Sequence, residues 1–205
     1  MGRLGHDQDA KRSSRRSASR RWAAILAVAA GLLVPAVASA HPLGNFTINH
    51  YAGLVVGRDA IRLEVVIDMA EIPAFQERQA MDEDLDGTVS DAEGSAWAGP
   101  ACATLAQSLR LTRATTPLAL VPTANAVSFP PGAGGLSTLR LDCDFTAPLT
   151  PGLDGAAVIT FEDRSYTERI GWREIVATAD GTVLDTHGLP ATSPSAKLTS
   201  YPADL

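Results

Sequence analysis

The sequence predicts a mainly β fold, an antiparallel β-sandwich with an inserted helix–loop–helix segment. Short segments rich in β-branched and apolar residues recur along the chain, divided by turns rich in Gly, Pro and Asp. Such spacing is typical of sandwiches and barrels. Residues 72–110 interrupt the pattern with helix formers on both sides of an acidic loop. The helices are therefore expected to lie between the second and third strands.

The first two strands are expected at residues 46–56 and 61–67. The second of them alternates apolar with mostly polar side chains, the period of a half-buried strand. Residues 57–60 form a short turn with Gly and Asp, so the two strands should pair as a hairpin. Later strands are expected at 109–113, 118–121, 126–129, 136–145, 156–162 and 170–178.

The helical insertion is expected to contain three pieces. Pro73 stands in the first turn of the first helix, where its missing N–H costs nothing, and this helix should run to residue 81. A second helix is expected at residues 91–98. Gly99-Pro100 is predicted to end it, with a third helical piece at residues 101–109.

The first forty residues are predicted to be a secretory signal peptide. A basic start precedes an apolar run at residues 22–38, and Ala38-Ser39-Ala40 is a typical cleavage site. The run of about 17 residues is at the short limit for a membrane span, so an uncleaved anchor that tethers the protein to the membrane is the alternative. The protein is therefore expected outside the cytoplasm, periplasmic or extracellular. The domain itself is expected at residues 41–188, and the Pro/Ser/Thr-rich residues 189–205 as a tail or linker.

The mature chain is strongly acidic. Seven of the 17 Lys and Arg residues and two of the 23 Asp and Glu residues lie in the first forty positions, which leaves a net charge of −11. Such a surface repels nucleic acid and anionic lipid, so neither is expected as a partner. Nothing after Ala40 is apolar enough to span a membrane.

Cys102 and Cys143 are the only cysteines of the chain. In an oxidising compartment an isolated pair favours a disulfide, and their spacing is unlike that of a metal-ligand set. The alternative is two buried thiols.

Residues 82–93 match the calcium loop of an EF-hand. Such a loop requires oxygen ligands at positions 1, 3, 5, 7, 9 and 12 and a glycine at position 6. Gly87 occupies position 6, and Val89 at position 8 is the apolar residue that packs inward. The predicted ligands are Asp82, Asp84, Asp86, Thr88 through its carbonyl, Ser90 and Glu93.

The alternative interpretation of this loop is an acidic turn between two helices. Such a turn does not explain Glu93 at position 12, whereas a bound Ca²⁺ would relieve the repulsion among four carboxylates. Gly94 and Ser95 depart from the pattern, because an exiting helix usually offers a large apolar residue there. The chain has no second EF-hand to pair with, so the site is expected to be weak and structural.

Two histidines are candidate ligands for a transition metal. Cleavage after Ala40 would leave His41 first, where its α-amine and imidazole together could chelate Ni²⁺, Co²⁺ or Cu²⁺. His50 could join this site if the strand folds back. The alternative is that His41 merely follows the cleavage site and His50 is an ordinary strand residue.

The sequence shows no catalytic constellation. It contains no nucleophile elbow, no His-Glu-x-x-His motif and no phosphate-binding glycine loop. Glu162-Asp163 are adjacent acids, but Arg164 beside them indicates a surface ion pair. The chain is therefore expected to have no enzymatic activity and no small-molecule substrate, and an exported hydrolase is the minor alternative.

Four segments carry a family resemblance: residues 41–51 (HPLGNFTINHY), 68–77 (DMAEIPAFQE), 128–136 (SFPPGAGGL) and 170–176 (IGWREIV). Together they resemble the extracytoplasmic N-terminal region of bacterial, actinobacterial-type nickel/cobalt transporter-like membrane proteins. In that family the region precedes a bundle of transmembrane helices that carries the transport motif. The resemblance implies a non-enzymatic accessory domain that works beside a membrane permease, either fused to it or separate. The alternative is a freestanding secreted calcium-binding or interaction module.

Overall fold

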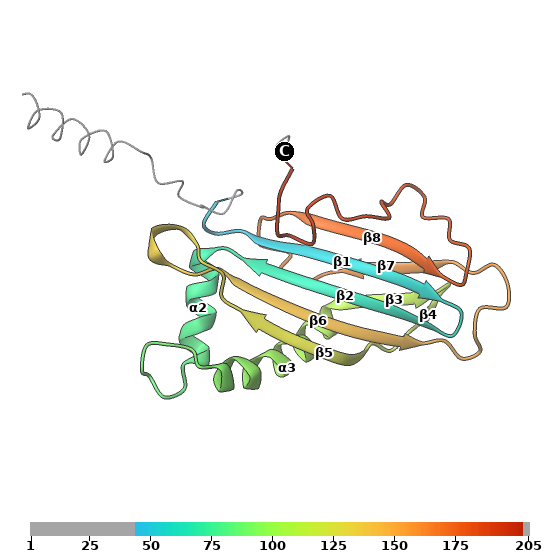
Figure 1. The fold of residues 1–205 in the computed structure, drawn as a ribbon. Coiled ribbons are helices and arrows are strands. Elements are labelled where there is room, and N and C mark those ends of the chain that lie inside the picture. Colours follow the sequence, from blue (N-terminus) through green and yellow to red (C-terminus); the bar gives the residue numbers. More distant parts are fainter. Residues whose placement is uncertain (1–43, 203–205) are drawn as a thin grey trace, which may run out of the picture. The chain divides into compact units, whose positions relative to one another are not determined.

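The structure is a computed structural model that describes residues 44–202. The predicted signal peptide and His41 lie outside this range. Within it, the expected mainly β fold with inserted helices is confirmed (Figure 1). A five-stranded sheet has the order β5-β6-β2-β1-β8, and a three-stranded sheet has the order β4-β3-β7.

The predicted hairpin is confirmed as β1 (Ile48–Gly57) and β2 (Ala60–Met69), which pair antiparallel. On the far side of β2 follow β6 (Leu139–Pro148) and then β5 (Val121–Ser128), both antiparallel to their neighbours. The second sheet contains β3 (Leu109–Arg113), β4 (Thr116–Pro117) and β7 (Ile159–Asp163). A short 3-10 helix, Ala133–Gly135, precedes β6.

One strand pair departs from the antiparallel expectation. β8 (Arg173–Asp180) runs parallel to β1. After β7 the chain crosses from the second sheet back to the start of β1, where the Ile48 amide donates to the Ile170 carbonyl and the His50 amide to the Trp172 carbonyl. Because β8 therefore begins beside the beginning of β1, the two strands must run in the same direction.

The core lies between the five-stranded sheet on one side and the three-stranded sheet and helix α3 (Asp91–Ser108) on the other. Alternate residues of β1, β2 and β6 point to this side, and Phe145 is its largest fully buried side chain. Each fully buried Leu, Ile, Val or Phe side chain contributes about 1.5–3 kcal/mol by leaving water. From the sheet come Ala52, Leu54, Ile61, Leu63, Val65, Ile67, Leu139, Leu141 and Phe145, and opposite them lie Ala98, Leu105, Leu109 and Leu111.

Helices α2 (Glu71–Met81) and α3 (Asp91–Ser108) form the insertion. The predicted break at Gly99-Pro100 is wrong, because α3 continues through Pro100 to Ser108. Proline removes one helical hydrogen bond. Burial of Ala98, Cys102 and Leu105 against the sheet offsets that loss, since tertiary packing supplies most helical stability in proteins.

The C-terminal segment, residues 189–202, contacts the outer face of the five-stranded sheet, although the sequence predicts a tail or linker there. Leu198 is buried against Tyr51, Val66 and Val176. The Ala177 amide donates to the Pro190 carbonyl. These contacts cover part of the sheet face opposite the core.

Candidate metal centre

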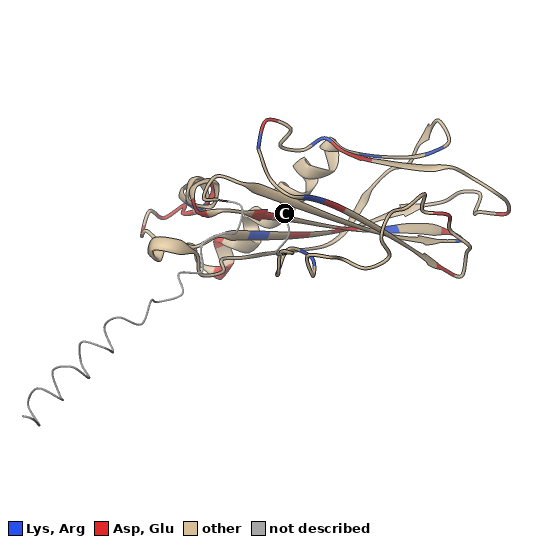
Figure 2. Ribbon diagram, turned by 90° about the horizontal axis from the view of Figure 1, so that it is seen from above, with Lys and Arg blue, Asp and Glu red and all other residues tan. Residues whose placement is uncertain are grey.

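The predicted calcium loop joins the end of α2 to the start of α3. Figure 2 shows the acidic positions gathered in this connection. The amide of Asp82 donates to the Arg78 carbonyl and ends α2. Ser90 begins α3 with a capping box, in which its hydroxyl accepts from the Glu93 amide and the Glu93 carboxylate accepts from the Ser90 amide. The two helix ends thus set the length of the loop.

The structure brings Asp82, Asp84 and Asp86 together. One carboxylate oxygen from each lies within 4.8 Å of the others, so the three could hold a metal ion. Backbone amides orient these carboxylates: Asp86 donates to both Asp82 and Asp84 at 3.1 Å, and Gly87 donates to Asp82 at 2.9 Å. Gly87 has φ +86°, a backbone conformation that glycine adopts without strain.

Glu93 is not one of the three gathered carboxylates, but it spans the loop. One of its oxygens accepts from the Glu83 amide at 2.8 Å, and the other accepts from the amide and hydroxyl of Ser90, both at 2.8 Å. The bonds from Ser90, then that from Glu83, hold the pKa of Glu93 below its ordinary value. Glu93 is therefore ionised at neutral pH and connects the first residues of the loop to the last.

Thr88 fixes the shape of the loop itself, whereas Val89 and the following Gly94 contact the rest of the domain. The amide and hydroxyl of Thr88 both donate to Asp86 at 2.7 Å. Val89 packs against the main core. A Cβ added at Gly94 would lie 3.1 Å from a methyl group of Val127 in β5. The glycine that departs from the EF-hand pattern therefore permits the close approach of α3 to this strand.

His50 is buried between the two sheets. Its Nδ1 lies 2.6 Å from Asp163 and 3.3 Å from the Ser165 hydroxyl. Its Nε2 is buried and has no hydrogen-bond partner in the described part of the chain. Because His41 lies outside the described residues, a joint transition-metal site of His41 and His50 stays a prediction.

Sequence reasoning missed the polar cluster around Asp163. This carboxylate accepts from the amide and hydroxyl of Ser165 and contacts His50, while Arg173 lies 3.7 Å away. Burial would raise the pKa of Asp163, but the hydrogen bonds from His50 and Ser165 outweigh it and hold the pKa below its ordinary value. The cluster ties β1 of one sheet to the end of β7 in the other.

The neighbours of Asp163 behave as the sequence predicts. Glu162 and Arg164 form an exposed ion pair. Asp163 lies between them in sequence, but at the end of β7 its side chain turns to the opposite, interior side and is only 8% exposed. Successive side chains of a strand point to opposite faces, and this alternation was the signal that could have told the exposed Glu162 from the interior Asp163.

The predicted disulfide is confirmed. Cys102 of α3 is bonded to Cys143 of β6, with a Cα–Cα distance of 5.6 Å. A disulfide indicates an oxidising, extracytoplasmic environment, because such bonds form and persist there. Within residues 44–202, no helix combines the length and apolar character needed to cross a membrane.

Comparison of the chain with protein-family models, with curated proteins and with solved structures gives no match.

Proposed function

We propose that this chain is an exported, non-enzymatic calcium-binding domain that accompanies a nickel/cobalt-transporter-like permease. The observation that carries the calcium part is the cluster of Asp82, Asp84 and Asp86, which occupies positions 1, 3 and 5 of a complete EF-hand pattern. The disulfide supports the exported location. The association with a permease rests on the family resemblance of four sequence segments.

The donor set favours calcium over other metals. Every predicted ligand is an oxygen, which excludes a site built for soft transition metals. Magnesium requires near-ideal octahedral geometry, whereas Ca²⁺ accepts six to eight oxygens in a flexible arrangement. The exposed loop, with its three gathered carboxylates and the nearby Glu93, fits the flexible oxygen coordination that Ca²⁺ accepts.

Calcium in this loop would stabilise the helical insertion rather than act as a sensor. The ion would hold the end of α2 to the start of α3, which the disulfide attaches to β6. Extracellular modules of this kind bind with dissociation constants of about 0.1–1 mM. At that affinity, 10 mM Ca²⁺ stabilises the folded state by about 1.4–2.7 kcal/mol.

Replacing Glu93 with glutamine should weaken calcium binding at least tenfold, because position 12 supplies two ligand oxygens in this type of loop. Calorimetric titration of the purified protein measures the effect. Glu83→Gln is the matched control, because Glu83 lies in the same loop with the same charge but at position 2, which is not a ligand position. The control should bind calcium within about threefold of wild type. Wild-type protein that gives no signal at 10 mM Ca²⁺ would disprove the site.

Deleting the gene for this chain should change the nickel or cobalt content of cells grown with limiting metal. Mass spectrometry of whole cells measures both metals, and the zinc and manganese contents serve as controls. A change confined to nickel or cobalt supports the association with a permease. Unchanged contents of both metals would favour the freestanding calcium-binding module instead.

A further inference from the structure

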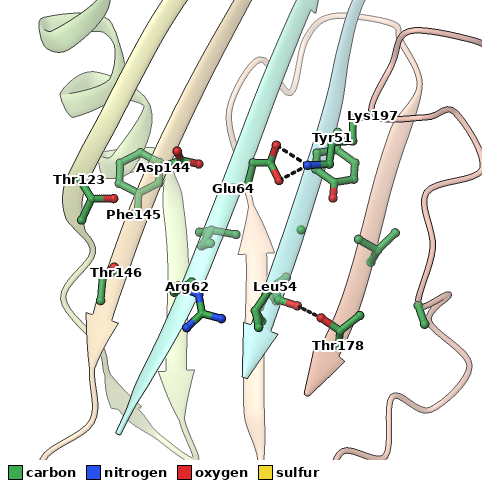
Figure 3. Close-up of a pocket in the computed structure, with 15 residues that line it drawn as sticks. Tyr51, Leu54, Arg62, Glu64, Thr123, Asp144, Phe145, Thr146, Thr178 and Lys197 are labelled. Atoms are coloured by element: carbon green, nitrogen blue, oxygen red, sulfur yellow. Dashed lines mark hydrogen bonds and ion pairs between the residues drawn. The ribbon is translucent and has the colours of Figure 1, made fainter. Parts of the chain in front are cut away.

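The outer face of the five-stranded sheet carries a cleft (Figure 3). Its volume is about 420 Å³, and it is bounded by the sheet on one side and by the C-terminal segment, through Ala191 and Lys197, on the other. Its lining includes the side chains of Tyr51, Arg62, Glu64, Asp144 and Lys197, and Arg62 pairs with Asp180, which does not line the cleft. None of them belongs to the proposed calcium loop.

Glu64 and Asp144 are directly opposite each other on the neighbouring strands β2 and β6. Like charges at opposite positions destabilise a sheet. Partial burial and then the charges of Glu64 and Asp142 raise the pKa of Asp144, while the charge of Lys197 lowers it. Lys197 pairs directly with Glu64, whereas Asp144 has no direct ion pair among the described residues. In the described part of the chain, only one of the two opposite carboxylates therefore has a direct ion-pair partner.

The ammonium group of Lys197 contacts Glu64 in the way that the ammonium group of a bound ligand would. The Lys197 Nζ atom lies 2.8 and 2.6 Å from the two carboxylate oxygens of Glu64 and 5.9 Å from the centre of the Tyr51 ring. A carboxylate beside an aromatic face is a favourable environment for an ammonium ion. The Tyr51 ring crosses over Gly53, where an added Cβ would lie 2.4 Å from the Tyr51 hydroxyl. The glycine thereby allows the ring to lie flat beside the cleft.

The backbone that carries Lys197 is strained. Ala196, Lys197 and Leu198 have φ values of +48°, +57° and +67°, three successive residues in the left-handed region. Each such residue costs about 1–2 kcal/mol. Burial of Leu198 and a hydrogen bond from Arg140 to the Lys197 carbonyl offset this cost. The Lys197 side chain is 48% exposed, so a ligand in solution can compete with it.

We propose that this cleft is a binding site for organic ammonium groups, and that Lys197 occupies it as an internal competitor. A ligand with two primary ammonium groups fits best, because one can replace Lys197 at Glu64 while the other neutralises Asp144. Displacement of Lys197 would then remove one of the contacts that hold residues 196–198 against the sheet.

The test compares the binding of 1,4-diaminobutane to wild-type protein and to Lys197→Met by calorimetry at constant ionic strength. The variant should bind at least tenfold more tightly, because the internal competitor is absent. Adding Glu64→Gln to that variant should abolish the gain, and neutral 1,4-butanediol should not bind. Asp84→Asn in the Lys197→Met background is the matched control for the acidic calcium loop, and it should leave the diamine affinity unchanged. Equal affinity of wild type and Lys197→Met would overturn the proposal, as would a gain that survives Glu64→Gln.

A second measurement uses wild-type protein alone. The Leu198 amide donates to the Ser195 hydroxyl at 2.9 Å. Saturating diamine should speed hydrogen exchange at this amide at least threefold, because the turn loses the contact of Lys197 with Glu64 and opens more often. Unchanged exchange at saturation would contradict displacement of Lys197.

Discussion

Replacing Cys102 and Cys143 together with alanine should lower the free energy of unfolding by about 4 kcal/mol. The two residues are 41 positions apart, and closing a loop of this length removes that much conformational entropy from the unfolded chain. The bond also joins α3 to the central region of the sheet, so its loss should loosen the helical insertion first. Urea unfolding followed by circular dichroism measures the change.

Wild-type protein in a strong reductant is the control for the cysteine variant. The reduced protein should lose a similar amount of stability, because it has lost the same covalent link without losing any side chain. A loss below about 1 kcal/mol in both samples would show that the link adds little to the folded state. A loss in the variant alone would assign the effect to packing of the sulfur atoms.

Asp163→Ala should destabilise the protein by about 3 kcal/mol. The change leaves the buried His50 and Ser165 side chains without the carboxylate that they contact, and each buried polar group left unsatisfied costs about 1–3 kcal/mol. Glu162→Ala is the matched control on the same strand. Its ion pair with Arg164 is exposed, so the control should lose less than about 1 kcal/mol. Equal losses in the two variants would contradict a special role for the buried cluster.

The Asp163 contribution should also depend on pH in a defined direction. Its folded-state pKa lies below the ordinary value of 3.8, so folding favours the ionised form. The stabilisation is therefore fully present above the ordinary pKa and is lost as the pH falls through the folded-state pKa. Denaturant titrations from pH 7 to pH 2 should show the gap between wild type and Asp163→Ala narrowing below pH 3.8. A gap of constant size across this range would show that ionisation of Asp163 is not involved.

The elements that depend on local pattern were predictable from the sequence. The β1–β2 hairpin follows from two apolar runs joined by a short turn, and the acidic loop follows from the spacing of its side chains. The disulfide was predictable for a different reason, because two cysteines allow one pairing. In each case the residues that determine the feature are close in sequence or unique in type.

Other features depend on contacts between distant parts of the chain, and the tertiary structure alone decided them. The parallel placement of β8 follows from where the chain leaves the second sheet. The continuity of α3 through Pro100 follows from burial of one helix face against the sheet. His50 meets Asp163 across 113 residues, and Lys197 meets Glu64 across 133. Periodicity and spacing describe only neighbours along the chain, so they determined the elements and the acidic loop, whereas packing of the sheets determined which charged side chains meet.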